Sequence, residues 1–437
     1  MAKKENCHAE HFDKLSASLV SASANIEAPY ELPDGWKWEK ISNLSDIYTG
    51  NSINETVKKE KYTGIKEGLN FIGTKDVDFD GTINYENGVK ISDYENFKTV
   101  PANTPLLCIE GGSAGKKLGI TSEQVCFGNK LCAFVCKNVE PKLVYYYLQT
   151  NAFFYSFMKE RHGLIGGVSV GTLKNIPFPL PPTLAEQKRI VNRIETMFAK
   201  LDEAKEKAQN VVDSFETRKA AILHKAFTGQ LKIDNEELSI EDWEEKKLGE
   251  VCESIFDGDH MPPPKAESGI PFLVISNVNT GFLSFDNTRY VPNDYYDSLS
   301  ETRKPKTGDV LYTIVGSYGI PVLVDSDRAF CFQRHMALLK PSKLISSRYL
   351  WYVLQSNEMY QKATSIATGT AQLTVPIKGL RELTIPVPPL NYQLSIVNFL
   401  NTVLEKESRA KEAAQTVLDQ IALLKKSILA RAFRGEL

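Results

Sequence analysis

Long apolar runs are missing from this chain of 437 residues, in which no stretch of 18 or more consecutive apolar residues occurs. A helix that crosses a bilayer needs about 20 such residues, so we expect no membrane span. Residues 1–29 contain no apolar core of the secretory type, and we therefore expect a cytosolic protein. The length predicts two or three domains rather than one.

An excess of positive charge is also missing. The chain has 52 Lys and Arg residues against 54 Asp and Glu residues, which gives a net charge of -2. A free-standing nucleic-acid-binding protein usually carries a basic excess. Any contact of this chain with DNA must therefore use local patches, or partner proteins that supply part of the positive field.

Cysteine is scarce, because only seven residues are spread over the whole chain. This odd number argues against a disulfide framework. The tightest group is Cys126, Cys132 and Cys136, whose even spacing predicts one face of a single strand. Residues so placed lie too far apart to share one zinc ion, and we expect small buried apolar side chains.

A long internal repeat is present instead. Residues 187–231 align without a gap with residues 393–437, and 20 of the 45 positions are identical. Both segments end on Ala-Phe-x-Gly-x-Leu, and each follows a proline cluster, at 177–182 and 385–389. Proline ends a preceding strand and cannot continue a helix backwards. Each half is therefore predicted to contain a globular block, a proline stop and a long helix.

The two globular blocks correspond more faintly and are rich in β-branched and aromatic residues between Gly, Asn and Asp turns. This composition predicts mostly strands, with a short helix around LVYYYLQT and RYLWYVLQ. The predicted fold class is α+β. The predicted order is an N-terminal arm or short helix (1–30), a first block (31–182), a central long helix (183–231), a linker (232–242), a second block (243–389) and a C-terminal long helix (390–437).

Apolar residues follow both long helices at alternating steps of four and three, which is typical of a coiled-coil seam. The predicted seam or partner-interface residues are Ile190, Ile194, Leu201, Val211, Phe215 and Ile222 in the first helix, and Ile396, Leu400, Val417, Ile421, Leu424 and Ile428 in the second. Arg218 and Glu407 interrupt the two seams and could face each other in an antiparallel pair. Such a pair would separate two similar blocks related by a pseudo-twofold axis. The alternative is two helices that each pack on their own block, and the matched seams favour the pair.

The segment IEGGSAGKKLGI at 109–120 has the glycines and lysines of a phosphate-binding loop. However, Gly111 and Gly115 are separated by three residues rather than four, and Lys116 is not followed by Ser or Thr. The second half keeps only Gly-Ser-x-Gly, at 316–319, without the lysines. We predict a tight turn between strands, and an NTPase that uses Lys116 is the least favoured function.

Two similar globular blocks held at a fixed separation could bind a periodic target. The grooves of DNA repeat about every 34 Å. Because the two blocks differ in sequence, each would read a different half-site. The target would then be asymmetric and split by an unread spacer, whose length the helices would set.

Several segments carry a resemblance to a known family: PLPPTLAEQKRIVNRIE, the terminal KAFTGQL and RAFRGEL, the opening ELPDGWKWEKI, and FDGDHMPPPKAESGIPFLVISNV. They resemble the DNA-specificity (S, HsdS) subunit of type I restriction-modification enzymes, from about residue 30 to 437. One departure is the extra residue Thr183 before residues 184–187. The second copy, PPLNYQ, has Asn-Tyr in place of Ala-Glu. Neither change breaks a seam.

The resemblance implies a subunit without catalysis of its own, whose two target-recognition domains read a bipartite site in double-stranded DNA. It also implies two adenine-N6 DNA methyltransferase subunits docked on the helix pair, and two ATP-driven restriction-translocase subunits. S-adenosylmethionine, ATP and Mg²⁺ would act in those partners, with no cofactor on this chain. The sequence contains no Asn/Asp-Pro-Pro-Tyr/Phe methyltransferase motif. The alternatives are a scaffold for proteins and a specificity subunit whose methyltransferase and nuclease are fused in one partner.

Candidate DNA contacts lie in the two glycine turns and in polar runs that interrupt apolar strands. Glycine lets a backbone approach phosphate, Ser and Lys bind phosphate, Asn and Gln pair with adenine, and Arg pairs with guanine. The candidates are Gly112, Ser113, Lys116, Lys117, Asn129 and Lys130 in the first block, and His260, Gly316, Ser317, Tyr318, Gln333, Arg334 and His335 in the second. For the turns, a plain hairpin with solvated lysines is an equal alternative.

Two further segments are ambiguous. Residues 257–260, Asp-Gly-Asp-His, contain metal-ligand types, but nothing nearby supplies further ligands at a metal spacing. We expect no metal there and predict a rigid loop near DNA, with residues 50–52 as its counterpart. Phe12, Leu15 and Leu19 have helical spacing, which predicts a short docking helix, and a disordered arm is an equal alternative.

Overall fold

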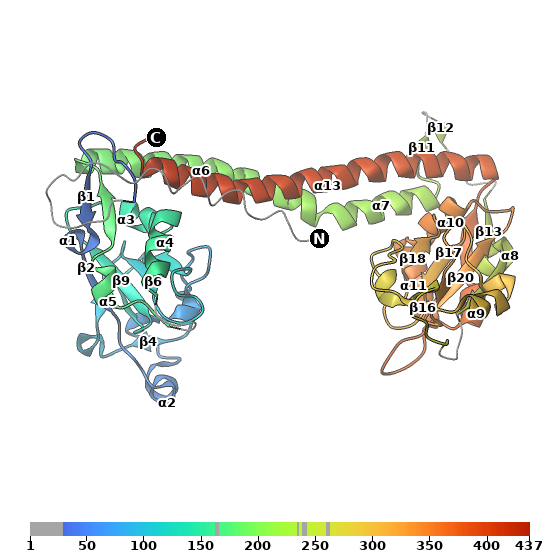
Figure 1. The fold of residues 1–437 in the computed structure, drawn as a ribbon, viewed down its shortest axis with the longest axis horizontal. Helices are drawn as coiled ribbons and strands as arrows, with labels where there is room; N and C mark the ends of the chain where they lie inside the picture. Colours follow the sequence, from blue (N-terminus) through green and yellow to red (C-terminus); the bar gives the residue numbers. More distant parts are fainter. Residues whose placement is uncertain (1–28, 162–165, 234–235, 238–242, 259–262) are drawn as a thin grey trace. The chain divides into compact units, whose positions relative to one another are not determined.

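The computed structural model describes residues 29–161, 166–233, 236–237, 243–258 and 263–437. The chain divides into two compact units. Unit 1 comprises the residues up to 206 together with residues 418–437, and unit 2 comprises residues 207–417. Each unit contains one β-rich block and part of each long helical region. We call these blocks head 1 (residues 29–182) and head 2 (residues 243–389) (Figure 1).

Head 1 contains two four-stranded sheets, with strand orders β2-β9-β6-β7 and β4-β3-β8-β5, and a two-stranded sheet β1-β10. Its strands are β1 (Lys37–Lys40), β2 (Ser45–Thr49), β3 (Leu69–Ile72), β4 (Lys90–Ile91), β5 (Thr99–Val100), β6 (Pro105–Cys108), β7 (Leu118–Ile120), β8 (Val125–Phe127), β9 (Leu131–Cys136) and β10 (Pro177–Leu180). Its helices are α1 (Ile41–Leu44), α2 (Glu55–Val57), α3 (Pro141–Tyr147), α4 (Asn151–Lys159) and α5 (Val170–Leu173), with short turns η1 (Lys58–Tyr62), η2 (Thr74–Asp76) and η3 (Tyr94–Asn96).

Head 2 repeats this plan with strand orders β14-β20-β17-β18, β16-β15-β19 and β13-β21. Its strands are β13 (Glu244–Lys247), β14 (Cys252–Asp257), β15 (Ile270–Leu273), β16 (Arg289–Val291), β17 (Val310–Thr313), β18 (Pro321–Leu323), β19 (Cys331–Phe332), β20 (Met336–Pro341) and β21 (Thr384–Val387). Its helices are α8 (Leu248–Val251), α9 (Asn293–Ser298), α10 (Ser347–Leu354), α11 (Asn357–Ile366) and α12 (Ile377–Glu382), with the turns η4 (Ile275–Asn277) and η5 (Glu301–Arg303). The short pair β11 (Lys232–Ile233) and β12 (Glu236–Glu237) precedes it in the chain.

The repeat in the sequence is therefore a repeat in the fold. In each head one strand pair runs parallel, β3 with β8 and β15 with β19, while the larger matched sheet is antiparallel throughout. The short helix expected in each head is confirmed by α3 and α10. The prediction that the heads contain mostly strands is incomplete, because helices also cover the sheets in both heads.

The prediction of one strand for three cysteines is wrong. Cys126 lies in β8, whereas Cys132 and Cys136 lie in β9, and the two strands belong to different sheets. A turn at residues 128–130 separates them, because Leu131 N–H closes a 3.0 Å hydrogen bond to the Gly128 carbonyl. Cys126 and Cys132 are buried, and burial raises the pKa of both thiols, to about 11 and about 12 respectively.

Three long helices follow the heads: α6 (Leu184–Asp213), α7 (Phe215–Phe227) and α13 (Leu390–Ala432). The extra Thr183 of the first copy caps α6, since its hydroxyl accepts the Glu186 N–H at 3.1 Å. The central helix, predicted without a break, is interrupted at Ser214. The hydroxyl of this serine donates to the Asn210 carbonyl, and such back-bonding bends helices.

A buried glutamine fixes the first turn of both α6 and α13 to its head. Gln187 Oε1 accepts the Glu140 N–H at 2.9 Å in unit 1. Gln393 Oε1 accepts the Ser346 N–H at 2.8 Å in unit 2. Both side chains are almost completely buried, so each helix starts at a fixed point on the globular block that precedes it.

In unit 1 the start of α6 and the end of α13 join the core of head 1. Ile190 and Ile194 share a hydrophobic cluster with Ile428 and Phe433, and the Phe433 ring lies 5.3 Å from that of Tyr147. The two helices run antiparallel here. Arg189 donates to the carbonyl of Leu437 at 2.9 Å, and further along α6 Asp202 pairs with Lys425 at 2.5 Å.

In unit 2 the roles are exchanged. The Phe227 ring of α7 lies 5.5 Å from that of Tyr349 in head 2, and the start of α13 joins the same core through Ile396 and Leu400. Arg218 Nε lies 2.7 Å from Glu407 Oε2, so the predicted pairing of these two seam exceptions is confirmed. Helices that pack only on their own block are therefore not found in either unit.

The predicted seam residues differ in burial. Ile190, Ile194, Ile396, Leu400, Ile421 and Ile428 are buried, and Leu201, Val211, Phe215 and Ile222 are partly buried. Val417 and Leu424 are 39% and 48% exposed, so the helix pair covers them less than the other predicted seam residues. Two helices alone cover only one side of each other, and residues at the margin of the stripe stay exposed where no head covers them. As partner-interface residues they stay a prediction.

Within the described part of the chain, no helix combines the length and the apolarity that a bilayer crossing requires. The same residues contain no group of three or more His, Cys, Asp or Glu side chains that could hold a metal ion.

Candidate nucleic-acid interface

The polar segments singled out in head 1 meet at one end of the antiparallel sheet β2-β9-β6-β7. β2 ends where β9 begins, because Thr49 is opposite Cys132, and β6 ends where β9 begins, because Cys108 is opposite Leu131. The segments that leave these strand ends are therefore neighbours. We call residues 50–52, 109–117 and 128–130 together the head 1 loop edge.

Backbone hydrogen bonds join these three segments. Asn51 N–H donates to the Phe127 carbonyl at 2.9 Å, and Ile109 N–H donates to the Lys130 carbonyl at 3.0 Å. Gly50 makes the closest approach, since a Cβ on this residue would lie 1.9 Å from the Phe127 carbonyl oxygen. Sequence reasoning did not assign this role to Gly50, and only a residue without a side chain fits there.

Head 2 brings its own polar segments to the equivalent sheet end. The residues opposite each other are Asp257 and Ala337, and Thr313 and Met336. We call residues 257–258, 314–319 and 333–335 the head 2 loop edge. Ile314 N–H donates to the His335 carbonyl at 2.9 Å, as Ile109 does to Lys130 in head 1. Gly258 repeats the close approach, with a Cβ position 2.3 Å from the Phe332 carbonyl oxygen.

The glycine turn of head 1 connects two strands, β6 and β7. A P-loop leads from a strand into a helix, so the turn lacks the context of a nucleotide-binding loop. Gly112 and Lys116 are exposed, and Ser113 is partly exposed. The ammonium of Lys117 donates to the Thr74 carbonyl at 3.1 Å and lies over the Phe79 ring, 5.1 Å from its centroid. Lys117 is therefore held inward, and its phosphate contact stays a prediction.

The glycine turn of head 2 corrects one assignment. Gly316 and Ser317 lie at the surface of the turn, with Gly316 N–H bonded to the Leu373 carbonyl at 2.9 Å. Tyr318, in contrast, is only 8% exposed and bonds through its hydroxyl to Thr364 at 3.0 Å. Its ring stacks on Tyr360 at 5.6 Å. The prediction that Tyr318 contacts DNA is wrong, because the side chain is part of the head 2 core.

The polar runs before β9 and β20 have the exposure that a contact surface needs. Asn129, Lys130 and Arg334 are exposed, while Gln333 and His335 are partly exposed. Desolvation by burial, with the nearby Arg334 cation as a second cause, lowers the pKa of His335. The lowered pKa favours the neutral imidazole, which can accept a hydrogen bond. His260 lies outside the described residues.

Arg161 is a positioning group that sequence reasoning missed. Its guanidinium donates to the Gly111 carbonyl at 3.3 Å and to the Gly166 carbonyl at 3.1 Å. It thus braces the glycine turn of head 1 from the segment after α4. No motif surrounds Arg161 in the sequence, so no local signal indicated this contact.

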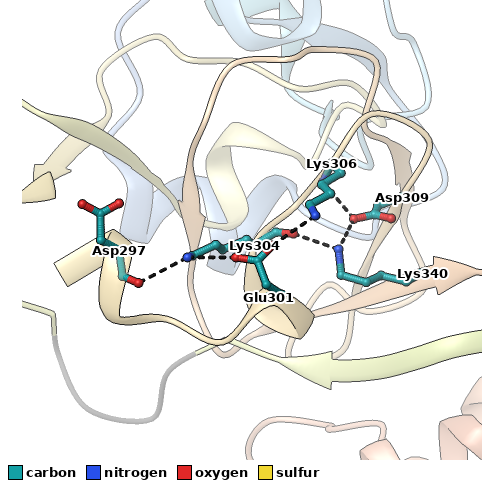
Figure 2. A network of polar contacts seen from close by, with 6 residues as sticks. All are labelled: Asp297, Glu301, Lys304, Lys306, Asp309 and Lys340. Carbon is teal, nitrogen blue, oxygen red and sulfur yellow. Dashed lines mark hydrogen bonds and ion pairs between the residues drawn. The ribbon is translucent and has the colours of Figure 1, made fainter. Parts of the chain in front are cut away.

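A polar network supports the opposite end of the head 2 sheet (Figure 2). It comprises Asp297, Glu301, Lys304, Lys306, Asp309 and Lys340. Lys340 and Asp309 form an almost buried ion pair at 2.6 Å, and Lys340 also donates to the Lys304 carbonyl at 2.8 Å. Asp309 precedes β17 and Lys340 lies near the end of β20. The network therefore fixes the strand ends that are remote from the loop edge.

Comparison with known proteins assigns the chain to a family. The family model for the type I restriction modification DNA specificity domain matches residues 33–213 and again residues 240–417. The chain belongs to this family. The two matches fall on the two halves of the internal repeat, and each includes one loop edge.

Relatives in this family span most of the chain. The type I restriction enzyme EcoBI specificity subunit of Escherichia coli is 24% identical, over 98% of this chain and 91% of the relative. The type I restriction enzyme MjaVIII specificity subunit of Methanocaldococcus jannaschii is 27% identical, over 80% of this chain and 82% of the relative.

Solved structures share the fold. The HsdS subunit from Thermoanaerobacter tengcongensis has a TM-score of 0.65 and 21% identity, and covers 94% of this chain and all 100% of its own. A chain from a type I R-M system has a TM-score of 0.72 and 19% identity, with coverage of 94% and 100%. At these identities the likeness supports the two-domain fold.

Proposed function

We propose that this chain is the specificity subunit of a type I restriction-modification complex, and that each loop edge reads one half of a bipartite, asymmetric DNA target. One observation carries the proposal. Polar segments that are far apart in the sequence converge on the same sheet end in both heads, and their side chains differ between the heads. Equivalent scaffolds with different polar residues are what two different half-sites require.

The exposed groups of the two loop edges have distinct roles in this proposal. In head 1, Lys116 and Lys130 bind phosphates, which fixes the position of the duplex. Asn129 is the candidate base reader, since an amide pairs bidentately with adenine. In head 2, Arg334 takes the corresponding place, and its guanidinium matches the acceptor pair of guanine.

The long helices have two roles in the proposal. As an antiparallel coiled coil they separate the heads and set the length of the unread spacer, and α13 alone, with 43 residues, would extend about 65 Å at 1.5 Å per residue. They also dock two DNA adenine methyltransferase subunits, for which the exposed Val417 and Leu424 are candidate contacts. Two restriction-translocase subunits complete the complex. S-adenosylmethionine, ATP and Mg²⁺ act in those partners.

Substitutions at the loop edges test the proposal in the chain expressed with its methyltransferase. Asn129→Ala and Arg334→Ala should each relax the methylated sequence at one half-site and leave the other half-site intact. Mapping of methylated adenines by sequencing measures this. Lys137→Ala is a matched control, because Lys137 follows β9 at the end remote from the loop edge. An identical methylated sequence in all three variants would contradict the proposal.

Two alternative functions can be distinguished from the proposed one by other observations. A scaffold that holds proteins would give a complex whose DNA binding does not depend on sequence. A specificity subunit with a fused methyltransferase-nuclease partner would give the same half-site behaviour, and the neighbouring genes would then encode one such partner instead of separate subunits.

A further inference from the structure

Each head exposes one phenylalanine on the hairpin that follows its first 3-10 turn in the parallel-strand region. Phe79 is 69% exposed and Phe282 is 68% exposed. In head 1 the hairpin is closed by a 2.9 Å bond from Asp78 N–H to the Thr82 carbonyl. In head 2 the equivalent hairpin is closed by a 2.8 Å bond from Ser284 N–H to the Asn277 carbonyl.

The two phenylalanines occupy different positions on these matched hairpins. Phe79 precedes the turn glycine Gly81, and Phe282 follows the turn glycine Gly281. Single exposed apolar side chains are common on protein surfaces, so exposure alone would carry no argument. A large exposed ring nevertheless recurs on both hairpins, although its position differs between the repeats.

The head 1 hairpin adjoins the loop edge. A Cβ on Gly81 would lie 3.2 Å from the carbonyl oxygen of Leu118, the first residue of β7. Lys117, the last residue of the glycine turn, holds its ammonium over the Phe79 ring. The Phe79 ring therefore lies next to the candidate DNA-binding surface, and the Lys117 ammonium lies beside it.

The head 2 hairpin shares a hydrophobic cluster with the segment before β18. Leu283 and Ile320 pack against one hydrophobic cluster, and Ile320 directly precedes β18. The guanidinium of Arg328 lies over the ring of Phe285, 4.5 Å from its centroid. The cation in this head therefore lies over Phe285, a partly buried neighbour of the exposed Phe282, and not over the exposed ring itself.

We propose that Phe79 and Phe282 are base-contacting residues, one per head, whose rings pack against DNA bases beside the half-site that each loop edge reads. The inference rests on the proposed function. Apolar side chains that insert between bases or contact a thymine methyl group are an established mode of DNA recognition. Such a contact involves no phosphate, and this gives it a signature that a lysine contact does not have.

Salt dependence separates the two kinds of contact. Phe79→Ala and Phe282→Ala should each weaken binding of the chain, assembled with its methyltransferase, to its target duplex by about tenfold. The slope of log affinity against log salt should stay unchanged, because no counterion-releasing contact is lost. Lys116→Ala should instead reduce that slope by about one. Leu344→Ala is the matched control, because Leu344 is 52% exposed but follows β20 at the end remote from the loop edge, and it should bind like the unchanged chain.

The charge of the hairpin tip provides a second test with a defined sign. Asp78 is exposed beside Phe79, so its carboxylate would be repelled by DNA phosphates if the tip approaches a duplex. Asp78→Asn should then tighten binding, whereas a tip that faces away from DNA would give no change. Unchanged affinity in both phenylalanine variants and in Asp78→Asn, with weaker binding in Lys116→Ala, would overturn the inference and leave the proposed function standing. If the unsubstituted complex showed no sequence-selective DNA binding, the proposed function itself would be overturned.

Discussion

The absence of a side chain at Gly50 allows the close backbone packing of the head 1 loop edge. A methyl group at this position would lie 1.9 Å from a backbone oxygen, so the backbone of β8 or of the following turn would have to move. Gly50→Ala should therefore lower the free energy of unfolding by about 3 kcal/mol, the upper range for overpacking. Denaturant unfolding measures this change.

Gly112→Ala is the control for that substitution. Nothing lies within 4 Å of a Cβ at Gly112, and its backbone is not left-handed. Its stability should match that of the unchanged chain within about 0.5 kcal/mol. Equal stability of Gly50→Ala and Gly112→Ala would show that the turn accommodates a side chain at Gly50, and the positioning role would be lost.

His335 links the stability of head 2 to pH. Its pKa in the folded chain is lowered, mainly by burial and then by Arg334, so the unfolded chain binds a proton at higher pH than the folded chain. Stability should therefore fall as the pH falls below the ordinary histidine value of about 6.5. The loss of unfolding free energy between pH 7 and pH 5 should be smaller in His335→Gln. Identical losses in the two chains would contradict this account.

Some residue roles could be predicted from sequence and others could not. Arg218 and Glu407 were paired correctly, because each is the only charged interruption of a regular apolar pattern. Tyr318 was misassigned, because a residue between two turn glycines reads as surface. Its burial depends on Tyr360 and Thr364, which are distant in the sequence and give no local signal.

At the scale of elements, the internal repeat suggests which substitutions the helix contact in unit 2 should tolerate. An offset of 206 residues aligns Arg218 with Leu424, and the same offset aligns Leu201 with Glu407. The positions equivalent to the Arg218–Glu407 pair are thus both leucines, Leu424 in the second copy and Leu201 in the first. Partly buried ion pairs can often be replaced by apolar pairs of similar size, whereas removal of one partner leaves an uncompensated charge.

The corresponding prediction is a double-mutant cycle on Arg218 and Glu407. Arg218→Leu alone should lower the free energy of unfolding by about 1 kcal/mol, a modest value because both side chains are partly exposed. Arg218→Leu combined with Glu407→Leu should recover most of that loss. Denaturant unfolding of the four chains gives the coupling energy, and additive losses would show that the pair makes no specific contribution.

Periodicity is a local property, so the helices and their proline-marked starts could be predicted from sequence. The meeting of the loop segments at one sheet end could not, because it depends on the pairing of residues that are 23 and 83 positions apart, as for Cys108 with Leu131 and Thr49 with Cys132. The cysteine error has the same origin. The turn at residues 128–130 divides one apolar run into strands of two sheets.

At the scale of the whole molecule, the two units differ in how the chain builds them. Unit 2 is one continuous segment, whereas unit 1 needs residues 418–437 as well as its N-terminal part. Phe433 is 1% exposed in the core of head 1, and its carbonyl accepts the Tyr30 hydroxyl at 3.0 Å. The last residues of the chain therefore belong to the core of the first head.

Phe433→Ala and its repeat counterpart Phe227→Ala should destabilise different units. Truncation of a buried phenylalanine costs about 3–5 kcal/mol, so each variant should unfold one unit more readily and leave the other unchanged. Limited proteolysis, with the cleavage sites mapped, reports which unit opens. Cleavage of head 2 in Phe433→Ala, with head 1 intact, would contradict this division.

The discontinuity of unit 1 also sets an order for biosynthesis. Residues 207–417 are synthesised as an unbroken segment before residues 418–437, so every residue of unit 2 exists before unit 1 is complete. Head 1 is synthesised first but lacks Ile428, Leu429 and Phe433 until these three residues have been added. The domain that is made first is therefore finished last, and a premature stop codon shortly before residue 428 would remove three residues from the core of head 1.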